Sequence, residues 1–303
     1  MHHVARARST AAARTKAVSS ARRSSAQPTR SSGGATTSSA SAGGPSAYGP
    51  RNIGSGPYPA EVAGPIVTAL TGAGISTDSG IPDFRGPDGV WTRDPEAEKL
   101  ATIDTYLADP EVRRRSWLAR RANPAWVAEP NAGHLALVAL ERLGQLHAIV
   151  TQNIDRLHQR AGSSPDRVLE IHGNMVEAVC WTCGARSTTA EALARLDAGE
   201  DDPACLVCGG ILKTATIMFG QALDPDVLDA SVRAAESCDV FVAVGTTLQV
   251  HPAAGLCDVA LASGAQLVIV NGGPTAYDAI AHRVRRGSIS ELLPALVAEL
   301  TEA

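Results

Sequence analysis

The sequence predicts an α/β fold in which a doubly wound parallel sheet carries a smaller second domain. Short apolar runs rich in β-branched residues alternate with helical stretches over residues 65–270, an order typical of a parallel sheet covered by helices. Two Cys-x-x-Cys pairs interrupt this alternation and indicate a separate metal-binding module. A chain of 303 residues has room for one large domain and a smaller one.

Residues 1–57 are rich in Ser, Ala, Gly and Arg and contain almost no large apolar side chains. Such a segment cannot bury enough surface to fold, so we expect a disordered tail followed by a folded domain at 58–303. The tail is similar to a transit peptide in being rich in Arg and Ser and free of acid. An over-long start-site assignment or a basic arm for nucleic acid would look the same.

The net charge of −4 is unevenly spread along the chain. Eight of the 27 Lys and Arg residues lie in residues 1–51, where no acid occurs, so the remainder holds 19 basic against 31 acidic residues. An acidic body argues against nucleic acid as a partner and suits cationic partners such as lysine-rich protein segments. No apolar run approaches the ~20 residues of a membrane span, so we expect a cytoplasmic protein without a membrane partner. The oligomeric state stays open.

The elements follow in order along the chain. The runs that read as strands are 65–71, 146–151, 168–171, 214–219, 239–244 and 266–270. Helices are expected from Asp109-Pro110, over 131–143, over 224–236 and over 252–263, where N-caps, first-turn prolines or a closing glycine mark their ends. His134 reads as a core or capping histidine. The interruptions at about 87–130 and 176–213 are where we expect the small domain.

Residues 72–86 follow the first strand and begin with two glycines, Gly72 and Gly74. Bare backbone amides between a strand and a helix can hold a diphosphate, although an ordinary tight turn is the alternative. The third glycine of the dinucleotide fingerprint is missing, because Thr77 stands in its place. The tripeptide 83–85 favours a ligand, since it adds an acid, an aromatic face and a cation one short loop further on.

Polar residues also follow the next two strands. Gln152, Asn153 and Asp155 could hold an amide and a ribose at the carboxyl edge of a sheet, and a turn that caps the next helix is the alternative. His172 ends the strand at 168–171. A histidine there could act as a general base, since its ordinary pKa lies near working pH, or it could be structural.

Cys180-x-x-Cys183 and Cys205-x-x-Cys208 are 21 residues apart and match a tetrahedral Cys₄ zinc site. Disulfides or a redox pair are the alternatives, and neither suits a chain without a clear secretory signal. Four thiolates leave no open coordination position, so the zinc is expected to be structural.

Taken together, these segments resemble the sirtuins, the NAD-dependent protein lysine deacylases, from about Ile66 to the C-terminus. The glycine stretch, the Gln-Asn-Ile-Asp motif, His172-Gly173 and the cysteine pairs come in the family order. The resemblance implies a sirtuin-type catalytic domain at 58–303, with a Rossmann-like large domain and a small domain made of a helical module and a zinc ribbon. It implies NAD and one structural Zn²⁺ ion as cofactors, and acylated-lysine proteins as partners.

The implied reaction removes an acyl group, acetyl in the first place, and yields nicotinamide, O-acyl-ADP-ribose and free lysine. By resemblance, the catalytic residues are His172, which takes a proton from a ribose hydroxyl, and Asn153, which positions the nicotinamide half. Two other classes remain: an NAD-dependent protein mono-ADP-ribosyltransferase, and a non-catalytic NAD-binding regulator that contacts nucleic acid. The acidic body and the presence of His172 argue against the regulator.

The resemblance also implies the contacts with NAD, from the diphosphate region to adenine. Phe84 is expected to shield the reactive ribose carbon from water. The implied cofactor-binding residues are Gly72, Ala73, Gly74, Ser76, Asp83, Phe84, Arg85, Gln152, Asn153, Ile154, Asp155, Gly245, Thr246, Thr247, Asn271, Gly272, Gly273 and Ile289.

Substrate contacts are implied at Phe219, Gly220 and Val250. Met218 and Gln221 depart from the family pattern Lys-Pro-x-x-x-Phe-Phe-Gly-Glu in the strand that lines the substrate channel. These departures leave the acyl and peptide preference open.

A second departure concerns Trp117 and Arg120. Family members that remove negatively charged acyl groups have Tyr-x-x-Arg in this helix, and here tryptophan replaces the tyrosine. The arginine could offer a fork to a succinyl carboxylate, so both residues are candidate substrate contacts. The alternative is an anchored tryptophan beneath a solvated basic face.

Overall fold

The computed structural model describes residues 64–302 except 87–88, 95–96 and 98–100. The predicted disordered tail at 1–57 lies outside these residues. The strands are β1 (Val67–Thr71), β2 (Leu146–Thr151), β3 (Val168–Glu170), β4 (Gly173–Cys180), β5 (Arg186–Thr188), β6 (Leu212–Thr216), β7 (Val240–Val244), β8 (Gln266–Val270) and β9 (Arg283–Arg285). The α-helices are α1 (Val90–Arg93), α2 (Ile103–Ala108), α3 (Pro110–Arg121), α4 (Ala132–Arg142), α5 (Leu157–Ala161), α6 (Thr189–Asp197), α7 (Pro225–Glu236), α8 (Leu256–Ala262) and α9 (Ile289–Glu302).

The main sheet has the strand order β3-β2-β1-β7-β8-β9, and all of its neighbouring strands pair in parallel. The chain builds the sheet outward from β1 to β3, then crosses to β7 and continues outward on the other side. The order therefore reverses between β1 and β7, and in such sheets ligands bind outside the carboxyl ends of the strands at this switch point. The predicted doubly wound sheet is confirmed.

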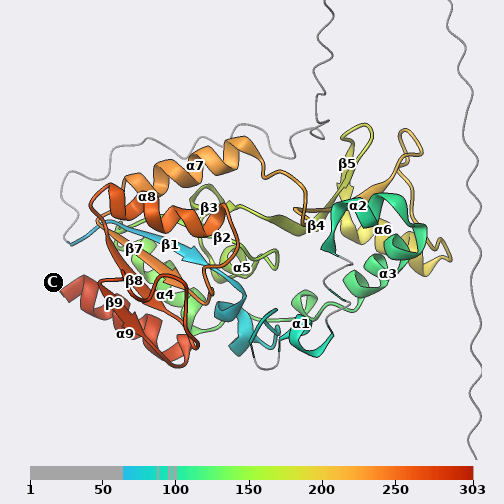
Figure 1. Cartoon of the computed structure of the whole chain (residues 1–303). Helices are drawn as coiled ribbons and strands as arrows, with labels where there is room; N and C mark the ends of the chain where they lie inside the picture. Colours follow the sequence, from blue (N-terminus) through green and yellow to red (C-terminus); the bar gives the residue numbers. More distant parts are fainter. Residues whose placement is uncertain (1–63, 87–88, 95–96, 98–100, 303) are drawn as a thin grey trace, which may run out of the picture. The chain divides into compact units, whose positions relative to one another are not determined.

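Helices cover both faces of this sheet, with α7 and α8 on one face and α4 and α9 on the other (Figure 1). The alternation of side chains along each strand divides the core between the two faces. Leu70 and Phe241 pack with α7 and α8, whereas Ala69 and Val242 pack with α4 and α9. Because both faces are covered, the central strands are apolar throughout, and this made them recognisable in the sequence.

A second sheet, with the order β5-β4-β6, pairs antiparallel and packs with α3 and α6 around a small apolar cluster. The strand expected at 214–219 forms at Leu212–Thr216, and it belongs to this second sheet. Its assignment to the parallel sheet was therefore wrong. The second sheet, α3 and α6 together form the small module. Its strand β4 begins just after the chain leaves the main sheet at β3, and β6 pairs with the edge of β4 instead of a strand of the main sheet.

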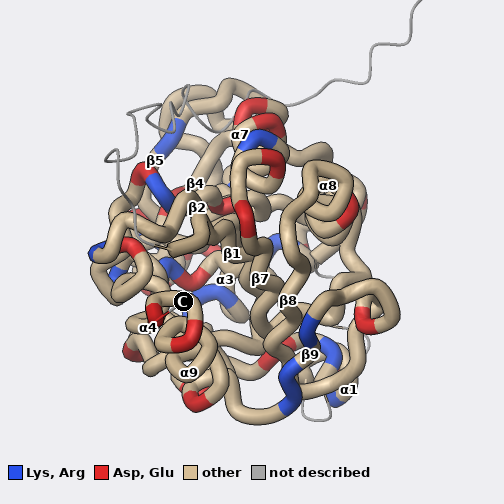
Figure 2. Tube along the Cα trace, turned by 90° about the vertical axis from the view of Figure 1, so that its left-hand side faces the viewer, with Lys and Arg blue, Asp and Glu red and all other residues tan. Residues whose placement is uncertain are grey.

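Two C-terminal elements were not predicted. β9 extends the main sheet next to β8, and α9 covers β8 although it contains Pro294. Arg283 and Arg285 of β9 both pair with Glu299 of α9, so one carboxylate offsets part of the positive charge of this strand (Figure 2). Within the described residues, no helix is long and apolar enough to cross a membrane.

The first turn of α4 is held by hydrogen bonds to its own side chains and to the turn after β1. The Asn131 side chain accepts from the Gly133 amide at 2.9 Å, and His134 Nδ1 accepts from the Asn131 amide at 3.3 Å. The same asparagine donates to the carbonyl of Ile75 at 2.7 Å, which ties the helix to the turn after β1. The prediction of a core or capping histidine at 134 is confirmed.

Candidate active site

A cavity of about 1430 Å³ lies at the carboxyl edge of the main sheet. Its walls come from the turns after β1, β2, β3, β7 and β8, and from the segment that follows β6. Small-molecule sites usually measure about 300–1,000 Å³. The larger volume here suits a dinucleotide together with part of a second substrate.

The turns after β1 and β7 meet backbone to backbone at the switch point. A Cβ atom on Gly74 would lie 2.8 Å from Gly245 Cα, and one on Gly245 would lie 2.3 Å from the amide nitrogen of Ile75. Gly245 also has a φ of +62°, which favours glycine. These glycines allow two polar turns to close on each other beside the cavity.

This packing corrects one expectation about the glycine turn. The Gly72 amide donates to the carbonyl of Val244 at 2.9 Å, and the Gly74 amide donates to the carbonyl of Gly245 at 2.8 Å. Both amides are therefore bonded within the protein and do not point free at an anion. The sequence could not show this, because the partner strand lies about 170 residues away.

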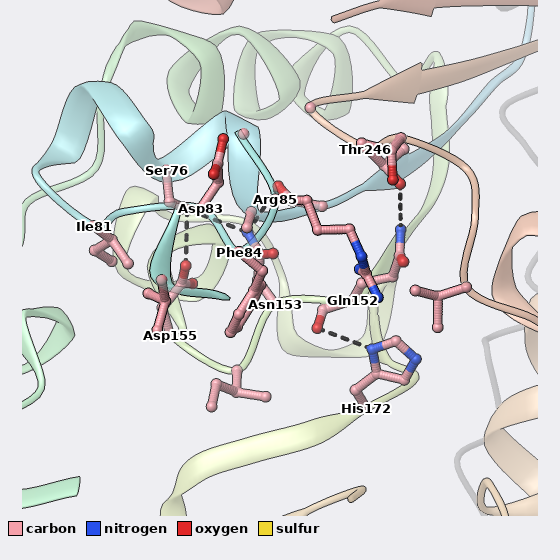
Figure 3. Close-up of a pocket in the computed structure, with 18 of the residues that line it drawn as sticks. Ser76, Ile81, Asp83, Phe84, Arg85, Gln152, Asn153, Asp155, His172 and Thr246 are labelled. Carbon is pink, nitrogen blue, oxygen red and sulfur yellow. Dashed lines mark hydrogen bonds between the residues drawn. The ribbon is translucent and has the colours of Figure 1, made fainter. Parts of the chain in front are cut away.

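The loop after β2 is held against the first turn by a set of side-chain hydrogen bonds (Figure 3). Ser76 Oγ donates to Asp155 Oδ2 at 2.8 Å, while Asn153 Nδ2 donates to Ser76 Oγ and to the Gly72 carbonyl, each at 3.2 Å. Burial raises the pKa of Asp155, and its hydrogen bonds from the Leu157 amide and Ser76 act in the opposite direction. The amide and carboxylate are thus fixed before any ligand enters.

His172 faces the cavity from the end of β3, and its ring is oriented by the preceding loop (Figure 3). Its Nδ1 lies 3.2 Å from the carbonyl oxygen of Gln152. A carbonyl only accepts, so Nδ1 carries the hydrogen and the neutral ring has its lone pair on Nε2. Burial lowers the pKa of His172, and the bond to Gln152 raises it in part. The imidazole is therefore neutral at neutral pH, as a base must be.

Aromatic rings and one cation form a rim that the sequence analysis identified only in part. Trp91 lies between Phe84 and Phe219, with ring centroids 4.7 and 5.5 Å away. The Arg85 guanidinium carbon lies 4.5 Å from the centroid of a Trp91 ring. Trp91 was missed because no spacing rule links it to the glycine turn. The one sequence signal that could have indicated Trp91 as a site residue is its position soon after residues 83–85.

The substrate-side predictions divide into two groups. Phe219, Gly220, Val250 and Arg120 line the cavity. Trp117 does not: its side chain is 1% exposed and packs in the apolar cluster of the small module. We therefore drop Trp117 from the proposed substrate contacts, since the next turn of α3 brings Arg120 to the cavity while Trp117 anchors the helix.

Arg120 belongs to a cluster of cations and hydroxyls beneath this wall. Its Nη2 donates to Thr214 Oγ1 at 3.3 Å, and Lys213 Nζ donates to the carbonyls of Thr214 and Thr216 at 2.9 and 2.6 Å. Burial lowers the pKa of Lys213 to about 7 and that of Arg120 to about 10. Neither cation pairs with a carboxylate among the described residues.

The structure brings the predicted cofactor set together on one cavity, although its members span more than 200 residues of sequence. Asn271 donates from Nδ2 to the carbonyl of Gly273 at 2.8 Å, which closes the turn after β8. His251, which the sequence analysis did not single out, also lies on the cavity wall. The predicted residues that line the cavity are Gly72, Ala73, Gly74, Ser76, Asp83, Phe84, Arg85, Gln152, Asn153, Ile154, Asp155, His172, Gly245, Thr246, Thr247, Asn271, Gly272, Gly273 and Ile289.

The four predicted metal ligands also meet. The Sγ atoms of Cys180, Cys183, Cys205 and Cys208 all lie within 4.8 Å of one another, with separations of 3.5 Å for Cys180–Cys208 and 3.7 Å for Cys183–Cys205. These distances exceed a disulfide bond of about 2.05 Å. They fit the edges of a tetrahedron with metal–sulfur bonds of about 2.3 Å, so the cluster fits structural zinc.

Comparison with known proteins identifies the family. The sequence profile of the Sir2 family matches residues 72–252. A relative from Streptomyces coelicolor, NAD-dependent protein deacetylase 2, is 59% identical over 233 residues, which cover 77% of this chain and 97% of the relative. This chain belongs to the Sir2 family. NAD-dependent protein deacylase 2 of Archaeoglobus fulgidus is 41% identical to this Sir2-family chain, covering 76% of it and 89% of the relative.

Solved structures agree with this Sir2-family assignment. A Sir2 structure with a deacetylated p53 peptide and 3′-O-acetyl ADP ribose superposes with a TM-score of 0.71 at 36% identity, covering 77% of this chain and 93% of that one. Sir2Tm bound to a propionylated peptide gives a TM-score of 0.68 at 34% identity, with 77% and 92% covered. The fold, the family and the dependence on NAD predicted from the sequence are confirmed.

Proposed function

We propose that this Sir2-family chain removes acyl groups, acetyl in the first place, from lysine side chains of proteins. NAD, when bound, supplies the ribose carbon that gives up nicotinamide and takes the acyl oxygen. One water molecule is consumed as the lysine amine leaves, so the products are nicotinamide, O-acyl-ADP-ribose and free lysine. The observation that carries the proposal is the orientation of His172. The Gln152 carbonyl occupies Nδ1 and leaves the Nε2 lone pair available at the wall of the cavity.

In this proposal His172 is the general base and accepts a proton from a ribose hydroxyl at Nε2. Burial lowers its pKa, so the ring is already neutral at neutral pH. Asn153 positions the nicotinamide half. Its Nδ2 group is bonded to Gly72 and Ser76, which leaves Oδ1 to accept a hydrogen bond from the ligand.

The diphosphate contacts are assigned to groups other than the two glycine amides. The amides of Gly72 and Gly74 are paired with Val244 at the end of β7 and with Gly245 directly after it, so we assign the diphosphate to Ala73, Thr246 and the guanidinium of Arg85. Arg85 rests on Trp91 in this structure and exchanges that ring for the anion when the dinucleotide binds.

Acyl selection is assigned to the wall that contains Arg120. The 59% identical relative is named a deacetylase, which supports acetyl as the first choice. Arg120 faces the cavity with a hydroxyl as its side-chain partner, and this supports some acceptance of acidic acyl groups. Arg120→Leu separates acetyl from succinyl selectivity. If the arginine binds the succinyl carboxylate, turnover of succinyl peptide falls at least about tenfold, while turnover of acetyl peptide stays within about threefold.

The deciding experiment incubates purified protein with NAD and a panel of acetyl-, propionyl- and succinyl-lysine peptides and follows them by mass spectrometry. Acyl loss that requires NAD and releases nicotinamide supports the proposal. ADP-ribose retained on protein without acyl loss would move the transferase reading into first place. Solved Sir2 structures hold acetylated and propionylated peptides, which supports acyl-lysine segments as partners. The proposal includes a cytoplasmic location, where the cysteine cluster stays reduced.

A further inference from the structure

Glu170 is a buried carboxylate that no step of the proposed reaction uses. It ends β3, is 2% exposed and does not line the cavity. Three side chains donate to it. Arg156 Nη1 lies 3.1 Å from Oε1 and 3.0 Å from Oε2, Gln159 Nε2 lies 3.0 Å from Oε1, and Asn174 Nδ2 lies 3.2 Å from Oε2.

The donors come from the two segments that carry the proposed catalytic groups. Arg156 directly follows Asp155, at the end of the loop that holds Asn153. Asn174 lies two residues after His172, and Glu170 itself lies two residues before it. The Glu170 carboxylate therefore bonds both the loop that holds Asn153, called the nicotinamide loop, and the segment around His172. None of these bonds lies on the cavity wall.

Backbone contacts join the same two segments. The Met175 amide donates to the Ile154 carbonyl at 3.0 Å, and the Ile171 amide donates to the Thr151 carbonyl at 3.0 Å. These bonds lie on either side of the bond between His172 and Gln152. The carboxylate of Glu170 adds a side-chain brace to this backbone ladder.

Arg156 also has a backbone conformation that needs support. Its φ is +66° and its ψ +16°, in the left-handed region that residues other than glycine, asparagine and aspartate seldom occupy. This residue turns the chain from Asp155 into α5. Such outliers persist where the surroundings hold them, and here the bond from the guanidinium to Glu170 does so.

We infer that Glu170 and Arg156 form a positioning clamp that sets His172 relative to Asn153, an inference that rests on the proposed function. A buried ion pair adds little net stability compared with apolar packing, so its contribution is geometric. A displacement of about 1 Å between catalytic groups can cost on the order of 10²-fold in rate. The clamp acts on turnover through the base and the nicotinamide loop, and it touches neither substrate.

The test uses Glu170→Gln, which removes the charge and keeps the shape, and Arg156→Asn, which removes the guanidinium and accepts the left-handed backbone. We expect kcat to fall about 10- to 100-fold in each, while KM for the acetyl peptide stays within about threefold. Arg156→Lys keeps the charge and recovers part of the lost kcat. The double variant is no slower than the slower single variant, because the two residues act as one unit.

Arg121→Gln is the matched control. It breaks an ion pair of similar length, Arg121–Asp197 at 2.7 Å, in which both side chains are exposed. Its kcat and KM stay at the parent values. The clamp is overturned if Glu170→Gln and Arg156→Asn keep kcat within twofold of the parent. It is also overturned if the fall in kcat is accompanied by a matching fall in melting temperature and a matching rise in peptide KM, because general loss of structure would then explain it.

A second readout separates failure of the clamp from failure of the proposed function. NMR titration of the His172 imidazole follows its bond to Gln152 without turnover, and that bond raises the pKa of His172. We expect this pKa to fall in Glu170→Gln and to stay unchanged in Arg121→Gln. A parent protein that removes no acyl group refutes the proposed function, and an unchanged His172 pKa in Glu170→Gln refutes the clamp.

Discussion

Two regions of this chain prepare a binding site by different physical means. At the switch point between β1 and β7, the backbones of two glycine turns pack directly against each other at the edge of the main sheet, whose two faces carry large apolar cores. In the small module, the buried apolar cluster is short and includes two of the metal ligands themselves. Its buried members are Trp117, Ala178, Cys180, Ala192, Leu196, Cys205 and Leu212. We therefore expect the first region to be stable without its ligand and the second to need its metal to hold its shape.

Loss of zinc is the largest expected effect and the sharpest test of this comparison. Cys180→Ala removes one of four ligands, so the protein should lose its zinc and at least about 3 kcal/mol of small-module stability, since zinc contributes on the order of 10 kcal/mol in small zinc domains. NAD affinity should fall less than about tenfold, because the dinucleotide turns rest on the other core. Metal analysis, calorimetry and NAD titration measure the three quantities.

Cys257→Ala is the control for this experiment, since Cys257 is fully buried in the main core and binds no metal. It should keep its zinc. The comparison between the two regions breaks down if Cys180→Ala melts like the parent, or if NAD binding disappears together with the zinc.

Removal of the proposed base should affect turnover and leave both regions folded. His172→Ala is expected to lower kcat by about 10²–10⁴-fold, the usual contribution of a general base, without loss of zinc or a lower melting temperature. Because burial lowers the pKa of His172, the parent should keep its activity down to about pH 6.5 and lose it only below. Normal nicotinamide release by the variant would refute the assignment.

The backbone fit at the switch point is tested by Gly245→Ala. The added Cβ meets the Ile75 amide at 2.3 Å and the φ is +62°, so we expect a loss of about 3 kcal/mol or more and weaker NAD binding. Gly264→Ala is the control, because it has a φ of +92° and nothing within 4 Å of the added atom. It should cost only about 1–2 kcal/mol, the penalty of the backbone conformation alone. Equal losses in denaturant unfolding would argue against a tight fit.

A smaller effect concerns acid stability behind the site. His134 and His158 lie with ring centroids 5.0 Å apart, and burial lowers the pKa of His134 to about 4 and that of His158 well below its usual value. The unfolded chain therefore binds more protons below about pH 6.5, and stability should fall between pH 6.5 and 4 by about 1–3 kcal/mol. His134→Asn should flatten this slope. An unchanged slope in that variant, measured by unfolding against pH, would remove the pair as its cause.

The parts of the fold with a strong local pattern were predictable. β2, β7 and β8 are short apolar runs buried on both faces, and α7 begins at an N-cap with proline in the first turn, so local residues decide them. The missed elements depend on distant partners. α9 contains Pro294, which argues against a helix in the sequence, yet the face of β8 needs a cover and α9 supplies it.

The candidate site shows the same division. The order of the motifs identifies the family and the cavity-lining residues, because each motif leaves the end of a strand and those ends meet in a parallel sheet. The sequence left open whether Trp117 contacts substrate or anchors its helix, and the structure decides for the anchor while Arg120 of the same helix lines the cavity. The sequence could not reveal Trp91 between Phe84 and Phe219.

By itself, the sequence determined the family, the NAD dependence, the four cysteines that meet in the fold and the central strands, because these depend on residue type and on spacing along the chain. Only the tertiary structure decided that the amides of Gly72 and Gly74 donate to the end of β7 and the residue after it, and that Glu170 bonds both Arg156 and the segment of His172. The reason is physical. Hydrogen-bond partners and close backbone contacts are set by which strands become neighbours, and chain spacing does not encode that.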